Sequence, residues 1–128
     1  MEPYLLIGGG GILGANTRYL VSAWAANRIG VGFPYGTLIV NGSGSFLIGL
    51  VLTILADRLH HNANATLLVA TGYLGAYTTF STFTYETIAL ARRSAIGPAA
   101  VNVLASIAAG AIGTALGILL ATGLSDRI

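Results

Sequence analysis

The sequence predicts an all-α membrane protein with four transmembrane helices in one domain of residues 1–128. Charged residues are 8% of the chain, whereas a typical soluble domain carries roughly 25%. Hydrophobic residues make up 55%, and a bilayer is crossed by about 20 apolar helical residues. Stretches of sufficient length occupy residues 4–26, 36–56, 66–91 and 97–124.

The four stretches differ in the charges that they contain. The first lacks the basic start of a signal peptide, since Glu2 stands there, and its apolar run is too long for one, so we expect it to be a transmembrane helix. Its internal charge is Arg18, the third stretch contains Glu86, and the second and fourth contain none. Short polar segments separate the stretches. Four crossings would place both termini on one side of the membrane.

The arginines of the connecting segments leave the orientation open. Arginine in short loops favours the cytoplasm. Arg58 and Arg127 lie on the side of the termini, against Arg28, Arg92 and Arg93 on the other. This small difference fits a weakly encoded single orientation, and it also fits insertion in both orientations with antiparallel self-pairing. We expect an oligomer in either case, because four short helices enclose little volume.

Small and polar residues recur every fourth position along each expected helix, and residues four apart share a helix face. Such stripes are typical of packing seams between membrane helices. Asn41 and Asn102 fit a seam less well, because an amide in lipid has several groups to satisfy and intramembrane polar groups often line pathways. We interpret Arg18 and Glu86 as structural charges, with Arg18 extending to the interface and Glu86 pairing with it or with a neighbour.

The segment TTFSTFTY, residues 78–85, has the composition of a strand in a soluble protein. A lone strand in lipid would leave its backbone unpaired. The segment is therefore either helical or a short break buried within protein, and its hydroxyl side chains can compete for backbone hydrogen bonds. A broken helix exposes carbonyls, which suit a hard cation such as Na⁺.

Phe80 and Phe83 would lie on one face of the helix that follows such a break. They could simply pack against lipid or the protein core. An aromatic ring has a positive edge, however, and ring edges beside hydroxyl and amide donors form a weakly electropositive lining. Such a lining suits a small anion better than a cation.

In three segments, residues 72–87, 9–19 and 34–49, the sequence resembles the Fluc, or CrcB, family of fluoride ion channels. GYLGAYTTFSTFTYET (72–87) resembles the signature of the family's third helix. GGGILGANTRY (9–19) resembles the glycine-and-arginine motif of the first helix, and PYGTLIVNGSGSFLIG (34–49) resembles the second-helix segment with its asparagine. The resemblance implies a dual-topology antiparallel homodimer in the plasma (inner) membrane, with two pores for selective, passive export of fluoride from the cytoplasm.

The resemblance also implies roles for individual residues. Phe80 and Phe83 match the phenylalanines whose ring edges face fluoride, and Asn41 matches the asparagine that lines the pore. The hydroxyls of the polar track are matched by Ser81, Thr82, Thr114 and Ser106. Backbone carbonyls of Gly75 and Thr78 match those that hold a structural Na⁺ at the dimer centre. Arg18 and Glu86 match the family's first-helix arginine and the acid after the motif.

Other functions fit the sequence less well. A small multidrug-type proton-coupled exporter also has four short helices, but it needs a membrane-embedded acid, typically in the first helix, where this chain has Arg18 and no acid after Glu2. A structural subunit of a larger membrane complex is a third hypothesis. An enzyme is not expected, because no nucleophile–base pair is evident. Nucleic acid is not an expected partner either, because the basic balance rests on few charges.

Overall fold

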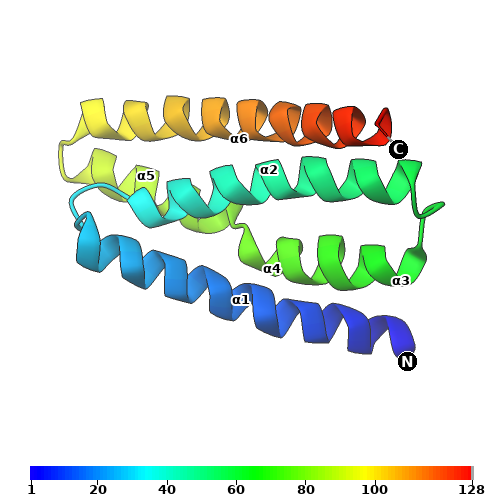
Figure 1. Ribbon diagram of the computed structural model, residues 1–128. Coiled ribbons are helices and arrows are strands. Elements are labelled where there is room, and N and C mark those ends of the chain that lie inside the picture. The colour runs from blue at the N-terminus through cyan, green and yellow to red at the C-terminus, as the bar shows by residue number, and fades with distance from the viewer. Residues whose placement is uncertain (128) are drawn as a thin grey trace.

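The protein is helical throughout its regular structure in a computed structural model that describes residues 1–127 (Figure 1). This confirms the predicted all-α class. Three helices are long: α1 (Glu2–Arg28), α2 (Tyr35–Asp57) and α6 (Ile96–Ser125). Between α2 and α6 the chain forms α3 (Ala63–Ala65), the π-helix η1 (Thr66–Leu74), α4 (Gly75–Tyr77) and α5 (Phe80–Arg92).

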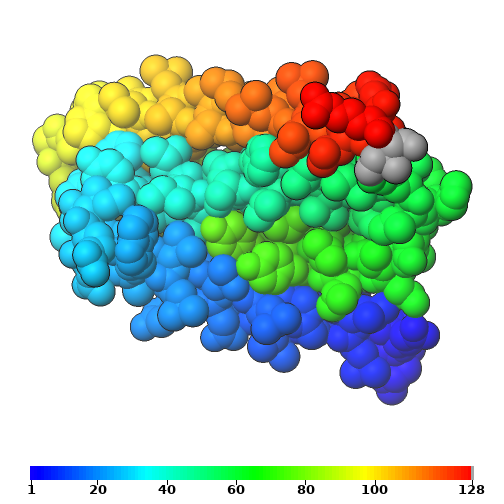
Figure 2. All heavy atoms as spheres, in the orientation of Figure 1, coloured from blue at the N-terminus to red at the C-terminus, as the bar shows by residue number. Residues whose placement is uncertain are grey.

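The helices lie side by side along one direction. α6 packs along α2, and α1 packs along η1 and α4, so that α2 lies between the outer helices α6 and α1 (Figure 1). The space-filling view shows α2 in contact with α6 on one side and with the segment from η1 to α4 on the other (Figure 2). Both chain termini lie at the same end of the molecule (Figure 1).

The ends of α1 follow from local chemistry. Glu2 lies in its first turn beside a proline, and Arg28 lies in its last turn. An acid near the N-terminus and a base near the C-terminus are both favourable toward the helix dipole. Gly30 then turns the chain toward α2 with φ of 125°, a conformation that side chains with a Cβ rarely adopt.

Two glycine contacts bring helix backbones together. A Cβ at Gly14 of α1 would overlap the carbonyl of Tyr73 in η1, and a Cβ at Gly117 of α6 would overlap the carbonyl of Phe46 in α2. Small residues allow such close approach between helices in a membrane, where dispersion and polar contacts replace the hydrophobic effect. These contacts fix the two sides of the bundle.

The distribution of apolar residues is that of a membrane protein. The central core consists of Val40, Leu74 and Tyr77, whereas many large apolar side chains on the outer helices are exposed. Two helices, α2 and α6, are long and apolar enough to cross a membrane. With 13 residues, α5 is only about 20 Å long, shorter than the roughly 30 Å hydrocarbon core.

Candidate functional site

The helical segment between α2 and α6 is interrupted at two threonines. Thr78 has φ and ψ of −81° and 158°, and Thr79 has −153° and 115°, so both are extended. Thr79 also caps α5, because its hydroxyl oxygen accepts a hydrogen bond of 3.2 Å from the Thr82 N–H. The interruption therefore creates a new helix start within the bundle.

Two backbone carbonyls lose their usual donors at this interruption. In a continuous α-helix each N–H donates to the carbonyl four residues earlier. The Thr79 N–H would thus reach Gly75, and the Thr82 N–H would reach Thr78. Instead, the Thr79 N–H donates to Asn41 Oδ1 at 2.8 Å, and the Thr82 N–H donates to the Thr79 hydroxyl. Oxygen atoms of this kind are ligands for hard cations.

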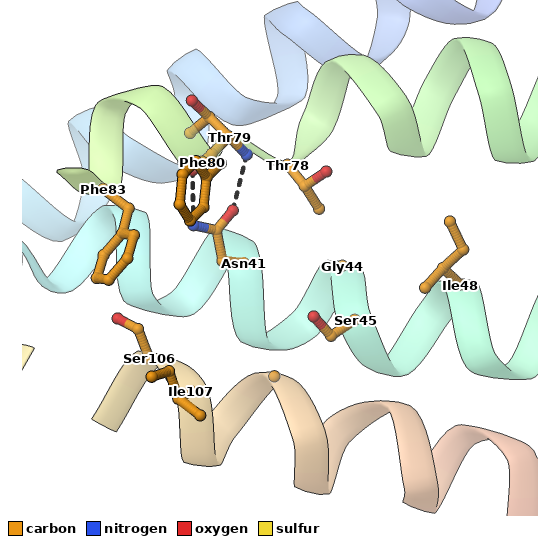
Figure 3. A pocket seen from close by; sticks show the side chains of 11 residues that line it. Asn41, Gly44, Ser45, Ile48, Thr78, Thr79, Phe80, Phe83, Ser106 and Ile107 are labelled. Carbon is orange, nitrogen blue, oxygen red and sulfur yellow. Dashed lines mark hydrogen bonds between the residues drawn. The ribbon is translucent and has the colours of Figure 1, made fainter. Parts of the chain in front are cut away.

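Asn41 on α2 joins the interruption from the side. Its Nδ2 donates to the Thr79 carbonyl at 2.8 Å, and its Oδ1 accepts from the Thr79 N–H at the same distance (Figure 3). An amide nitrogen carries two protons. The side chain can therefore support the backbone and still offer one proton to another acceptor.

A groove of about 320 Å³ opens beside this contact. Four residues predicted for the anion pathway line it together: Asn41, Phe80, Phe83 and Ser106. They come from α2, α5 and α6 (Figure 3). The rest of the lining consists of Gly44, Ser45, Ile48, Thr78, Thr79, Ile107 and Gly110.

The two phenylalanines form one wall of the groove. Their ring centroids are 5.8 Å apart and the rings are inclined at 56°. Phe83 is half-buried and points toward Ser106 of α6, whereas Phe80 is 76% exposed (Figure 3). An aromatic ring is electropositive at its edge, so a tilted pair can present ring edges to a passing anion.

Other predicted pathway residues lie outside this groove. Thr82 lines a separate cavity of about 280 Å³ together with Arg18. Ser81 is exposed on α5. Thr114 donates to the Ser45 carbonyl at 3.2 Å and so joins α6 to α2 beside the groove.

The two internal charges occupy different surroundings. Glu86 accepts a hydrogen bond from the hydroxyl of Thr37, which is buried on α2. Arg18 is half-buried and faces the cavity that it shares with Thr37 and Thr82. Glu86 on α5 is thus bonded to a hydroxyl of the neighbouring helix α2.

Sequence reasoning missed the parts played by Thr37, Gly44 and Thr79. A Cβ at Gly44 would overlap the methyl group of Thr78, so this glycine leaves room for the extended residues. The spacing of four from Thr37 to Asn41 on α2 indicated a shared face. It could not indicate that Thr79 would receive the amide.

Comparison with known proteins identifies the family of the chain. The family model described as "CrcB-like protein, Camphor Resistance (CrcB)" matches residues 5–118. A protein of Acidobacterium capsulatum named fluoride-specific ion channel FluC is 45% identical over 114 residues, which cover 89% of this chain and 91% of that protein.

Two further relatives carry similar names. The fluoride-specific ion channel FluC of a Roseiflexus species is 48% identical over 108 residues, covering 84% of this chain and 87% of the relative. The fluoride-specific ion channel FluC 2 of Moorella thermoacetica is 53% identical over 87 residues, covering 68% and 70%. Because the family model and these relatives cover most of the sequence, the chain belongs to the CrcB family.

Proposed function

We propose that this protein is a fluoride-selective ion channel that gives passive export of fluoride from the cytoplasm across the plasma (inner) membrane. Its relatives named as fluoride-specific ion channels support this function. The single structural observation that carries the proposal is the groove in which Phe80, Phe83, Asn41 and Ser106 converge.

The chemistry of the groove suits fluoride. A small anion holds its water strongly, and transferring it unpaired into an apolar medium is very costly. The remaining Asn41 amide proton and the Ser106 hydroxyl can replace part of that water, while ring edges of Phe80 and Phe83 add weak positive potential. Neutral donors bind an anion without a full positive charge, so the ion can leave again.

The exposed surface of α5 supports a homodimer. Phe80 and Tyr85 are 76% and 77% exposed, and Ser81 and Thr82 are exposed with them. Hydroxyl groups gain little from lipid, so a second copy is the better cover. We propose an antiparallel, dual-topology homodimer with four membrane crossings per chain, the third made by the interrupted segment, and two pores.

A structural Na⁺ at the dimer centre belongs to the same proposal. The carbonyls of Gly75 and Thr78 have lost their helical donors to Asn41 and Thr79. Gly75 is exposed on the surface of the monomer, where a second copy could approach the interruption. Uncharged carbonyl oxygens from two copies would supply hard ligands for Na⁺.

A transport assay tests the proposed function directly. Purified protein is reconstituted in liposomes loaded with fluoride or with chloride, and efflux is followed with ion-selective electrodes. We expect rapid fluoride efflux and chloride efflux at the level of protein-free liposomes. Equal efflux of both ions, or of neither, would contradict the proposal.

A further inference from the structure

A buried asparagine on α6 is bonded to α5 one turn beyond the groove. Asn102 is 2% exposed. Its Nδ2 donates to the Thr87 hydroxyl at 2.8 Å, and that hydroxyl donates to the Phe83 carbonyl at 2.8 Å. Within residues 1–127 this is the one side-chain hydrogen bond between α5 and α6.

The same asparagine also reaches the opposite wall of the groove. The Ser106 hydroxyl donates a hydrogen bond of 3.5 Å to Asn102 Oδ1. Ser106 and Phe83 face each other across the groove (Figure 3). The hydrogen bonds thus form a chain from Ser106 through Asn102 and Thr87 to the backbone of Phe83, with every donor matched to an acceptor.

We infer that Asn102 is a positioning residue that sets the separation of Phe83 and Ser106 and thereby the selectivity of the groove. This inference rests on the proposed function. Two contacts hold α5 to α2: Asn41 bonds Thr79 at the start of α5, and Thr37 bonds Glu86 farther along it. Neither contact fixes its distance from α6, whereas the Asn102–Thr87 bond does.

Asn102 also sets the resting direction of the Ser106 proton. A hydroxyl has one proton to donate, and a bond of 3.5 Å is long and weak. The Ser106 proton therefore points toward Asn102 and can turn toward an anion at little cost. Loss of the Asn102 oxygen would leave the hydroxyl free to adopt other directions.

The first experiment separates positioning from general stability. Thr87→Val and Asn102→Leu remove the contact between helices, whereas Thr87→Ser keeps the hydroxyl. Thr53→Val is the matched control, because Thr53 is also half-buried and bonds the carbonyl four residues earlier, in its own helix. All variants are reconstituted as assembled protein, and fluoride and chloride efflux are measured in parallel.

We expect Thr87→Val and Asn102→Leu to lower the ratio of fluoride to chloride efflux by about fivefold or more, as for the loss of one buried hydrogen bond. Thr87→Ser and Thr53→Val should keep the wild-type ratio. Unchanged selectivity in Thr87→Val, or an equal loss in Thr53→Val, would overturn the inference.

A second measurement does not depend on transport. 4-Fluorophenylalanine is placed at position 83, and its ¹⁹F resonance is recorded with and without Thr87→Val. The fluorine lies on the ring axis, so ring flips do not move it. We expect the single narrow resonance of the wild type to broaden or split in Thr87→Val. An unchanged line would refute the positioning role of Asn102, whether or not the protein transports fluoride. Absence of fluoride transport by the wild type would refute the proposed channel separately.

Discussion

Asn41 and Thr79 exchange two hydrogen bonds of 2.8 Å, one in each direction, across the gap between α2 and the interrupted segment. The asparagine amide thereby pairs with the peptide of Thr79 as a neighbouring strand would. Phe80 follows Thr79 directly, so the Asn41–Thr79 hydrogen bonds also hold the start of the phenylalanine wall of the groove in place.

Replacement of Asn41 by alanine should therefore weaken the fold and transport together. The Thr79 N–H and carbonyl would lose their partners, at a cost of about 1–3 kcal/mol for each group left buried. We expect a lower Tm in detergent and little fluoride efflux. Asn64→Ala, which removes an exposed amide bonded to Glu2, is the control. A wild-type Tm in Asn41→Ala would show that the pair is dispensable.

Phe80→Ile and Phe83→Ile test the aromatic wall. Isoleucine is apolar but has no electropositive ring edge, so we expect fluoride efflux to fall at least tenfold while the protein still assembles. Efflux is measured with a fluoride electrode and assembly by size-exclusion chromatography. Phe33→Ile, in the connection between α1 and α2, should behave like the wild type. Unchanged efflux in both groove variants would remove the rings from the mechanism.

Gly44→Ala tests the space opposite the interruption. Its Cβ would overlap the methyl group of Thr78 and lie 3.3 Å from the ring of Tyr77. Overpacking of this kind typically costs about 1–3 kcal/mol, so we expect a lower Tm and impaired fluoride efflux. Gly123→Ala, where no atom lies within 4 Å of the added Cβ, is the control. Equal Tm values for the two variants would mean that the backbone adjusts freely.

Substitutions of Glu86 distinguish a structural role of its carboxylate from a role in proton-coupled export. Glutamine can still accept the Thr37 hydroxyl, so we expect Glu86→Gln to keep its stability and most of its fluoride efflux. Glu86→Leu should lower the Tm, because the buried Thr37 hydroxyl would lose its partner. Proton-driven uptake of a cationic dye by the wild type, abolished in Glu86→Gln, would instead favour an exporter.

Removal of sodium tests the proposed cation at the dimer centre. Exchange of Na⁺ for N-methylglucamine should lower the Tm of the purified protein, because carbonyls of Gly75 and Thr78 from two copies would then face one another without a cation. Return of Na⁺ should restore the Tm. A Tm that is independent of Na⁺ at constant ionic strength would exclude a stabilising site.

The sequence predicted the helical class and the recurrence of polar residues at every fourth position, which on α2 includes Thr37 and Asn41, because both depend on local pattern. Continuous apolar composition marks a helix in lipid, and a spacing of four places residues on one face. Phe80 and Phe83 share a face of α5 because residues three apart are also neighbours on a helix surface. These features require no knowledge of how the helices pack.

Contacts between helices could not be predicted in this way. Glu86 is bonded to Thr37 rather than to Arg18, because the rotation of α2 relative to α5 determines which side chain lies within reach of the carboxylate. Thr114 bonds the Ser45 carbonyl because α6 lies close along α2. The nine π-helical residues of η1 likewise have no composition signal, since side-chain pattern does not report a shift from four-residue to five-residue hydrogen bonding.

The position of the two termini at one end of the molecule constrains how two copies could be fused (Figure 1). A short peptide from the end of α6 in one copy to the start of α1 in the next would place the copies in the same orientation. A single-chain pair with opposite orientations needs a connector that itself spans the bilayer, which takes about 20 apolar residues.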